Sequence, residues 1–357
     1  MEGSEAFAAA AIAAGCRFYA GYPMTPATEL LESMAKLLPQ YDGVCVNAES
    51  ELEAVGMTWG AAAAGARAAT GSTGQGLSLM QESIAEMCHA RLPVVILNMA
   101  RGQGDYYQAT RGGSHGDNRL ISLAPSSLPE AVSLVRLAFE LAEEWRNPVL
   151  VLGDYYLAHM SEAVTIGSQK PLAEIPRRDW AVDGSTSGSG HAKLISPVFD
   201  AKNYDPAFRG YGWKLESMAD HLTAMETSIE PMAEEYGTQD AELVVVAYST
   251  PARYLTYVIR QLRAEGLPIG IIRPITLWPF PAAAVSRAAE HARGLAVYEL
   301  NAGQMIDDVR LAVLGRSPVF AIGGPSYDGD GFGIAPDLNT DVLATRLRDA
   351  LDKVRKL

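Results

Sequence analysis

Short apolar runs alternate with amphipathic stretches over the first 160 residues of this chain. The runs at 16–19, 44–46, 66–70, 93–99 and 148–154 have the composition of buried parallel strands. The stretches at 4–15, 27–38, 51–65, 77–90 and 129–145 show helical spacing. This alternation predicts βαβ units, so we expect residues 1–160 to form an α/β domain with a parallel sheet covered by helices.

The same pattern returns in the last third of the chain. Apolar runs at 243–247, 268–273, 294–300 and 319–322 predict strands, and stretches at 251–265, 282–292, 304–314 and 340–354 predict helices. A second α/β domain is therefore expected over residues 240–357. The segment between them, 161–239, breaks the pattern: residues 184–190 have the composition of a linker, and residues 214–236 predict one long amphipathic helix. We interpret 161–239 as a connector that wraps this chain or reaches another.

One acidic residue follows a predicted strand directly. Ser50 precedes Glu53 by three residues, the spacing of a capping box, so a helix is expected to begin at Glu51. The strand 44–46 places Glu51 at the carboxyl edge of the sheet, where open α/β folds bind ligands. A carboxylate packed among the small residues of this helix needs a proton or a bonding partner. Glu51 is thus the first candidate for chemistry, the alternative being an acid that only stabilises the helix N-terminus.

Two further candidates lie near predicted strand ends. Thr25 is in a loop that two prolines restrain, and its hydroxyl either caps the helix 27–38 or faces a ligand. Arg101 follows the strand 93–99, and its charge requires a carboxylate or phosphate partner. That partner is either a ligand or a neighbouring acid such as Asp105.

The N-terminal helix is expected to be capped near Ser4.

The stretch 102–119 is long, polar and rich in glycine. A loop of this length inside a compact domain is usually functional or mobile. It contains His115, which is a possible catalytic base. A loop histidine without a visible partner is more often incidental, and both interpretations remain open here.

Composition and charge narrow the classes of function. A length of 357 residues suits two domains, and a net charge of −13 argues against nucleic acid or an anionic membrane as a partner. The three cysteines are far apart and form no C-x-x-C pair, so we expect neither an iron–sulfur nor a zinc motif and no metal on this chain. Sparse cysteines and an acidic N-terminus without signal-peptide features predict a cytoplasmic location.

Two glycine-rich turns have a composition typical of phosphate-binding loops. Residues 71–76 lack both the G-x-G-x-x-G spacing and a Walker lysine, so close packing explains them nearly as well. Gly329-Asp330-Gly331 matches the start of the motif with which thiamine diphosphate enzymes hold metal and diphosphate. The asparagine pair that completes that motif is missing, and we interpret 324–333 as a turn.

Several spaced motifs carry a family resemblance that spans both predicted α/β domains. They are Gly-Tyr-Pro-Met-Thr-Pro at 21–26, Glu-Ser-Glu at 49–51, the small-residue stretch 60–67, Ser-Leu-Met-Gln-Glu at 78–82, Tyr-Gln-Ala-Thr-Arg-Gly-Gly-Ser-His-Gly-Asp at 107–117 and Asn-Ala-Gly-Gln-Met at 301–305. Together they resemble the α subunit of 2-oxoacid:ferredoxin oxidoreductases. The 107–117 loop is most similar to the branched-chain (2-oxoisovalerate) type, although Arg111 occupies a position where that type often has lysine.

The resemblance implies a fold and a reaction. It implies a pyrimidine-binding domain of thiamine diphosphate enzymes followed by a domain like the C-terminal domain of transketolase. The implied activity is oxidative decarboxylation of a 2-oxoacid to acyl-CoA and CO₂, with thiamine diphosphate as cofactor and coenzyme A as cosubstrate. A partner β subunit would carry the diphosphate, Mg²⁺ and a [4Fe-4S] cluster, with further ferredoxin-like γ and δ subunits or ferredoxin receiving electrons.

The resemblance also assigns roles to residues. It places Glu51 against N1′ of the pyrimidine ring as the catalytic acid–base group, with a shared proton that burial beside Val55 and Met57 would favour. The cofactor-binding residues would be Pro23, Glu51, Thr73 and Gln75. The substrate-binding residues would be Thr25 and Arg101, at the carboxylate and 2-oxo group, and Tyr107 and Arg111, at the side chain.

Three alternative functions remain open. A 2-oxoglutarate or aryl 2-oxoacid substrate would preserve the family. A transketolase-like or dehydrogenase E1-type subunit would pass the acyl group elsewhere. A non-catalytic, regulatory nucleotide-binding protein would depend on the glycine turn at 71–76 alone.

Overall fold

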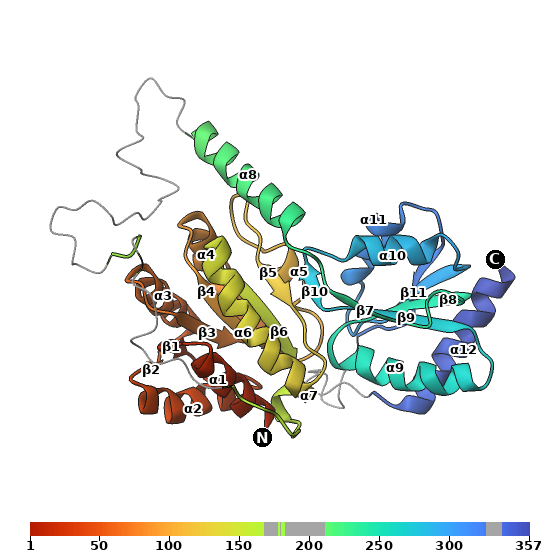
Figure 1. The fold of residues 1–357 in the computed structure, drawn as a ribbon, viewed down its shortest axis with the longest axis horizontal. Coiled ribbons are helices and arrows are strands. Elements are labelled where there is room, and N and C mark those ends of the chain that lie inside the picture. The colour runs from red at the N-terminus through yellow and green to blue at the C-terminus, as the bar shows by residue number, and fades with distance from the viewer. Residues whose placement is uncertain (168–177, 179, 183–210, 326–337) are drawn as a thin grey trace.

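The computed structural model describes residues 1–167, 178, 180–182, 211–325 and 338–357 (Figure 1). The linker-like stretch 184–190 and Gly329-Asp330-Gly331 lie outside these residues. In the described part of the chain, no helix is both long enough and apolar enough to cross a bilayer.

Seven strands form the first sheet, in the order β10-β5-β6-β4-β3-β1-β2. Six of them are parallel, and β10 is antiparallel to β5. Their bounds are β1 Phe18–Gly21, β2 Val44–Asn47, β3 Ala68–Ser72, β4 Val94–Ala100, β5 Ile121–Leu123, β6 Val149–Asp154 and β10 Thr276–Trp278. The parallel α/β arrangement expected from the alternating pattern is therefore present.

Helices cover both faces of this sheet. Along β4, Val94 and Ile96 belong to the core beneath α3 and α4, whereas Val95 and Leu97 belong to the core beneath α1, α2 and α6. Successive side chains of a strand point to opposite faces, so an uninterrupted apolar run suits a strand covered on both sides. The helices are α1 Gly3–Ala13, α2 Thr28–Leu37, α3 Glu51–Ala63, α4 Gly74–His89, α5 Tyr106–Thr110, α6 Leu128–Trp145 and α7 Tyr155–His159, with a 3₁₀ turn at Leu38–Tyr41.

The second sheet has five strands in the order β12-β11-β8-β9-β7. The strands are β7 Ala233–Tyr236, β8 Leu243–Val246, β9 Ile269–Pro274, β11 Gly294–Val297 and β12 Val319–Ala321. Its helices are α9 Ser249–Ala264, α10 Ala282–Ala289, α11 Met305–Val313 and α12 Thr340–Lys356, whereas Met225 of α8 Tyr211–Ser228 belongs to the first sheet's core beneath α1, α2 and α6. The core between this sheet and α10 and α11 is continuous with the core beneath α3 and α4, so apolar packing joins the two sheets.

Two short strands that the hydrophobic pattern did not predict connect the parts of the chain. β10 comes from the C-terminal third but extends the first sheet beside β5, and the amide of Ala124 donates to Ile275 O at 2.8 Å. β7 comes from the expected connector but pairs antiparallel with β9. Both have four residues or fewer, too few to show a period.

Two predictions about elements were wrong. The single helix over 214–236 ends at Ser228, and Ala233–Tyr236 is a strand; Pro231 lacks an amide hydrogen and cannot continue a helix. The strand near 44–46 is parallel but not buried, because β2 pairs only with β1 at the edge of the sheet and Val44 is 55% exposed.

Local details also differ from the expectations. Ser4 does not cap α1, which begins at Gly3; its hydroxyl donates to Ala158 O at 3.2 Å. The loop 102–119 contains the short helix α5, and α4 begins at Gly74 inside the glycine turn rather than at Leu77. These stretches are polar and rich in glycine, so they lack the apolar spacing that predicts a helix.

Asp154 joins the two sheets at a buried position. Its carboxylate accepts from the Leu157 amide at 2.9 Å, the Ser249 hydroxyl at 3.0 Å, and the amide and hydroxyl of Thr250 at 3.1 and 2.9 Å. Burial raises the pKa of this carboxyl. The contacts anchor the start of α9 against the end of β6.

Replacing Asp154 with alanine is expected to destabilise the chain by about 3 kcal/mol, because four buried donors lose their acceptor. The shift of the urea midpoint measures this loss. Asp240→Ala is the control, since Asp240 is exposed and pairs with Arg263 at the surface, so its loss should shift the urea midpoint much less. Equal shifts in the two variants would contradict the role assigned to Asp154.

Candidate active site

The carboxyl ends of four neighbouring parallel strands meet at one edge of the first sheet. The loop after β1 carries Thr25, β2 leads to Glu51, β3 leads to Thr73 and β4 leads to Arg101. Ligands of open α/β sheets bind at this edge. Residues from four separate stretches of sequence are thereby brought to one region.

Glu51 is the most buried acid of this region, with 2% of its surface exposed. It is the first residue of α3, as the capping-box spacing predicted: Ser50 Oγ accepts from the Leu52 amide at 3.2 Å and donates to the Glu53 carboxylate. Ser72 Oγ donates to Glu51 Oε1 at 3.1 Å. In the described part of the chain no arginine or lysine pairs with Glu51, so a neutral hydroxyl is its partner. Of its expected apolar neighbours, Val55 is buried but Met57 is 41% exposed.

Gly76 allows the Glu51 carboxylate to approach the first turn of α4. A Cβ at this position would lie 2.7 Å from Glu51 Cδ and would overlap both Glu51 Oε1 and Ser72 Oγ. Real Cβ atoms essentially never approach another atom so closely. The glycine turn 71–76 therefore does hold a functional group closely, although the group is a carboxylate of this chain.

Thr25, Gln75 and Arg101 are in direct contact. Arg101 Nε donates to the carbonyl of Thr25 at 2.9 Å, and Arg101 Nη1 donates to Gln75 Oε1 at 3.1 Å. Thr25 does not cap α2, because Ala27 is the N-cap residue and no side chain caps it. Since both acceptors are neutral, these two hydrogen bonds do not neutralise the guanidinium.

Asp105 does not form the salt bridge that was considered for Arg101. Its carboxylate accepts from Asn98 Nδ2 at 2.8 Å and from the Gly74 amide at 3.0 Å. Burial raises its pKa, while the two hydrogen bonds and the charge of Arg101 lower it. Asp105 thus fixes the start of α4 relative to β4.

The two remaining residues expected at the cofactor differ in exposure. Thr73 is fully buried, and its hydroxyl has no hydrogen-bond partner among the described residues. Pro23 is exposed in the loop after β1. Thr73 directly follows Ser72, which bonds to Glu51, and an unpartnered buried hydroxyl at this position is suited to a ligand group.

Tyr107 and Arg111 form their hydrogen bonds with α11 and with Gln304 just before it, rather than with Glu51 or Arg101. Arg111 binds Asp308 of α11 through both terminal nitrogens at 3.0 Å and lies 4.6 Å over the ring of Tyr107. The Tyr107 hydroxyl donates to Asp307, and its amide donates to Gln304 Oε1 at 2.9 Å. No hydrogen bond within the described ranges joins either residue to Glu51 or Arg101. They close the junction between the sheets.

Sequence reasoning missed Ser72, Gly76 and Asp105 as parts of this site. Ser72 is the last residue of β3, and Gly76 and Asp105 come soon after β3 and β4, so their positions at strand ends were the available signal. The turn at 71–76 contacts the start of α3 because β1 lies between β2 and β3 in the sheet. The spacing of apolar residues along the sequence does not reveal this strand order.

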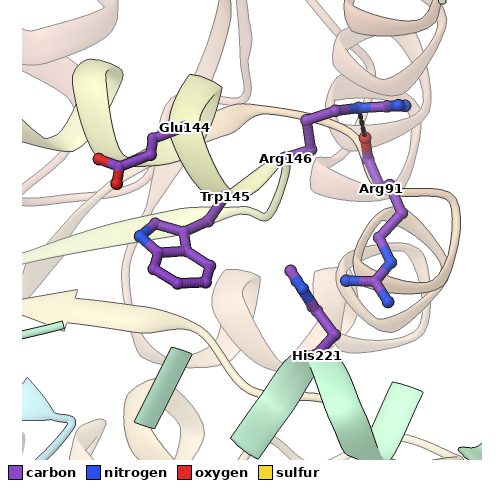
Figure 2. Close-up of a pocket in the computed structure, with 5 residues that line it drawn as sticks. All are labelled: Arg91, Glu144, Trp145, Arg146 and His221. Atoms are coloured by element: carbon purple, nitrogen blue, oxygen red, sulfur yellow. Dashed lines mark hydrogen bonds between the residues drawn. The ribbon is translucent and has the colours of Figure 1, made fainter. Parts of the chain in front are cut away.

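A pocket of about 320 Å³ lies at the opposite, amino edge of the sheet (Figure 2). Arg91, Glu144, Trp145, Arg146 and His221 line it, and Arg146 Nε donates to the Arg91 carbonyl at 3.0 Å. Burial first, and the charge of Arg91 second, lower the pKa of His221 to about 4. The lining residues come from the turns before β4 and β6, the end of α6 and α8, and they are separate from the residues around Glu51.

The chain is similar in sequence to several known proteins. Residues 9–202 match the family model described as pyruvate flavodoxin/ferredoxin oxidoreductase, thiamine diP-bdg, and residues 241–330 match pyruvate:ferredoxin oxidoreductase core domain II. Ketoisovalerate oxidoreductase subunit VorB of Methanothermobacter marburgensis is 37% identical, with 87% of this chain and 89% of that protein covered. 2-oxoglutarate synthase subunit KorA of Methanothermobacter thermautotrophicus is 36% identical, with 89% and 92% covered.

One solved structure has a similar fold along nearly the whole chain. It is a 2-oxoglutarate:ferredoxin oxidoreductase from Magnetococcus marinus with 2-oxoglutarate, coenzyme A and succinyl-CoA bound, and its TM-score is 0.79 at 24% identity. The match covers 98% of this chain and 65% of that longer one. At this identity, the similarity supports the fold of this chain only.

Proposed function

The chain belongs to the 2-oxoacid:ferredoxin oxidoreductase family, as its motifs indicated, and on that premise we propose that it is the α subunit that binds the pyrimidine ring of thiamine diphosphate. The reaction of the complex is the oxidative decarboxylation of a 2-oxoacid to acyl-CoA and CO₂. The observation that carries the proposal is the buried Glu51, whose partner is a hydroxyl rather than a cation.

The residues of this edge fit the cofactor. A carboxyl group buried without a cation is costly unless a donor or a shared proton compensates it, and a pyrimidine ring nitrogen supplies that interaction. The unpartnered hydroxyl of Thr73 offers a further polar contact beside it. Pro23 and Gln75 border the same edge.

Within the reaction, this chain's residues bind, orient and hold a proton. Glu51 holds the proton at N1′, and Ser72 fixes its carboxylate in one orientation through Oε1. Arg101 binds the substrate carboxylate, and Thr25 and Gln75 orient the guanidinium. Thiamine diphosphate, when bound, supplies the carbanion chemistry.

The surface around this edge suits a partner subunit. Three large apolar side chains are exposed on α3 and α4, which begin at this edge: Leu52, Met57 and Leu79. Exposed apolar groups that gather on neighbouring elements usually mark an interface. We propose that a β subunit covers them and carries the diphosphate, Mg²⁺ and a [4Fe-4S] cluster, while ferredoxin or ferredoxin-like γ and δ subunits receive the electrons.

The proposed substrate is a branched-chain 2-oxoacid. The sequence of the 107–117 loop favours this type. A 2-oxoglutarate substrate has a second carboxylate, and Arg111 is not free to bind it, because both of its terminal nitrogens are bonded to Asp308. Tyr107 and Arg111 would then shape the substrate pocket through their packing against α11 rather than through a charge.

The purified complex, assayed with 2-oxoisovalerate, 2-oxoglutarate, pyruvate and an aryl 2-oxoacid, tests this assignment. The proposal predicts the highest kcat/KM for 2-oxoisovalerate and reduction of a viologen dye that requires coenzyme A. A preference for 2-oxoglutarate would refute the substrate, and no reaction with any 2-oxoacid would refute the function.

Arg101→Ala should lower kcat/KM for the preferred substrate about 10- to 100-fold, since a charge-assisted bond to the carboxylate is lost. Arg348→Ala is the control, because Arg348 forms an exposed ion pair with Glu265 on the second part of the chain. An unchanged kcat/KM in the Arg101 variant would exclude the carboxylate role.

A further inference from the structure

A cluster of three metal-binding side chains lies away from Glu51, where α4 meets the loop after α5. Glu86 and His89 are three residues apart on α4 and therefore share a helix face. His115 comes from the loop, and one ligand atom from each of the three residues lies within 4.8 Å of the others. His115 Nε2 is 2.9 Å from Glu86 Oε1.

A hydrogen bond to a backbone carbonyl sets the tautomer of His89. His89 Nε2 is 3.3 Å from the carbonyl of Asp117, which can only accept, so the proton is on Nε2 and the lone pair is on Nδ1. His115 Nδ1 has the hydroxyl of Ser114 at 3.2 Å. Metal-binding histidines usually donate their other ring N–H to a carbonyl or similar acceptor in this way.

An ion pair between His115 and Glu86 explains only part of this arrangement. It does not account for His89 Nδ1, which is buried and has no hydrogen-bond partner within the described ranges. Buried polar atoms in proteins are normally bonded, so an unpartnered nitrogen beside two further ligand groups suggests a ligand.

The backbone of the loop is shaped to close over His89. Gly116 has a φ of +71°, and a Cβ there would lie 2.7 Å from His89 Cε1. Only glycine combines this conformation with such a close approach to the ring. The loop is therefore built to hold His115 and the Asp117 carbonyl on this part of α4.

We propose that Glu86, His89 and His115 bind one divalent transition-metal ion of the Zn²⁺ class. Two imidazoles and one carboxylate suit Zn²⁺, Co²⁺ or Fe²⁺ rather than the all-oxygen preference of Mg²⁺ and Ca²⁺, and water completes the coordination. The ion takes the place of the proton shared by His115 and Glu86, and that proton is released to solvent.

The ion would fix the loop after α5 to α4, close to the contact that this loop makes with α11. The same loop begins with Arg111, which holds Asp308 of α11. A metal bond at 115 therefore restrains the segment that joins the two sheets. This role is independent of the chemistry proposed at Glu51.

Calorimetric titration of the untagged, chelator-treated full chain with ZnCl₂ tests the proposal, and Co²⁺ titration followed by visible absorption gives a second readout. We expect one saturable site per chain, and His115→Ala and Glu86→Gln should each weaken it at least about 100-fold. His159→Ala is the matched control, because the His159–Glu2 pair lacks a third ligand group in the described part of the chain.

Circular dichroism confirms that each variant is folded before titration, and Glu86→Gln keeps the helix if the loop variant does not fold. Absence of a saturable site would overturn the proposal. So would a site that persists unchanged in both variants, since the metal would then bind elsewhere, at a cysteine for instance. Neither result bears on the function proposed for Glu51.

Discussion

Replacing Glu51 with glutamine is expected to lower 2-oxoacid-dependent turnover of the assembled complex by about 10²- to 10⁴-fold, the range of general acid–base catalysis. Glutamine has nearly the same shape and can still accept from Ser72, so folding and assembly should be retained. It cannot hold a transferable proton, which is the role assigned to the carboxyl group. Viologen reduction measures turnover, and size-exclusion chromatography measures assembly.

Glu53→Gln is the matched control for this change. Glu53 lies in the same first turn of α3 but is exposed, and it bonds to Ser50. It should keep nearly the wild-type turnover. Near-normal activity in the Glu51 variant would remove this residue from the mechanism, and equal losses in both variants would indicate a structural effect on the helix.

Gly76→Ala is expected to have an effect almost as large, about 10²-fold on turnover, without contact between the new methyl group and any substrate. The added Cβ would overlap Glu51 Oε1 and Ser72 Oγ, so the carboxylate must move. Alanine also favours a helix over glycine by about 1 kcal/mol, so the intrinsic helix preference of α4 would not be reduced. The loss should therefore appear in kcat more than in the thermal midpoint.

Gly104→Ala serves as the comparison, because a Cβ at Gly104 would meet no atom within 4 Å. Turnover of that variant should resemble the wild type. If Gly76→Ala were as active as Gly104→Ala, the position of the Glu51 carboxylate would not matter for the reaction.

Much of the fold could be predicted because long apolar runs and helical spacing dominate both α/β parts. The capping box identified the start of α3, and the strand before it placed Glu51 at the ligand edge of the sheet. The short strands β5, β7 and β10 were not predicted, because three or four residues carry no clear period. The partners of β7 and β10 are also far away in sequence. The helix expected over 214–236 ends at Ser228, because the amphipathic spacing continues past Pro231 but the helix cannot.

The position of the candidate site residues at one sheet edge could be predicted, but their mutual contacts could not, for a physical reason. Strand ends bring Thr25, Glu51, Thr73 and Arg101 to one edge, so their gathering follows from topology. Which side chains bond to one another does not follow. The contact between Ser72 and Glu51 depends on the spatial order of β3, β1 and β2, and the pairing of Arg111 with Asp308 joins residues 197 positions apart.

The most direct test of the central proposal is hydrogen–deuterium exchange at C2 of the thiazolium ring in the assembled complex, followed by quenching and NMR. If Glu51 holds the proton at N1′, exchange in the Glu51→Gln complex should be slower than in the wild type by about 10²-fold or more, while Glu53→Gln exchanges at the wild-type rate. Equal exchange rates in the wild-type and Glu51→Gln complexes would contradict the account.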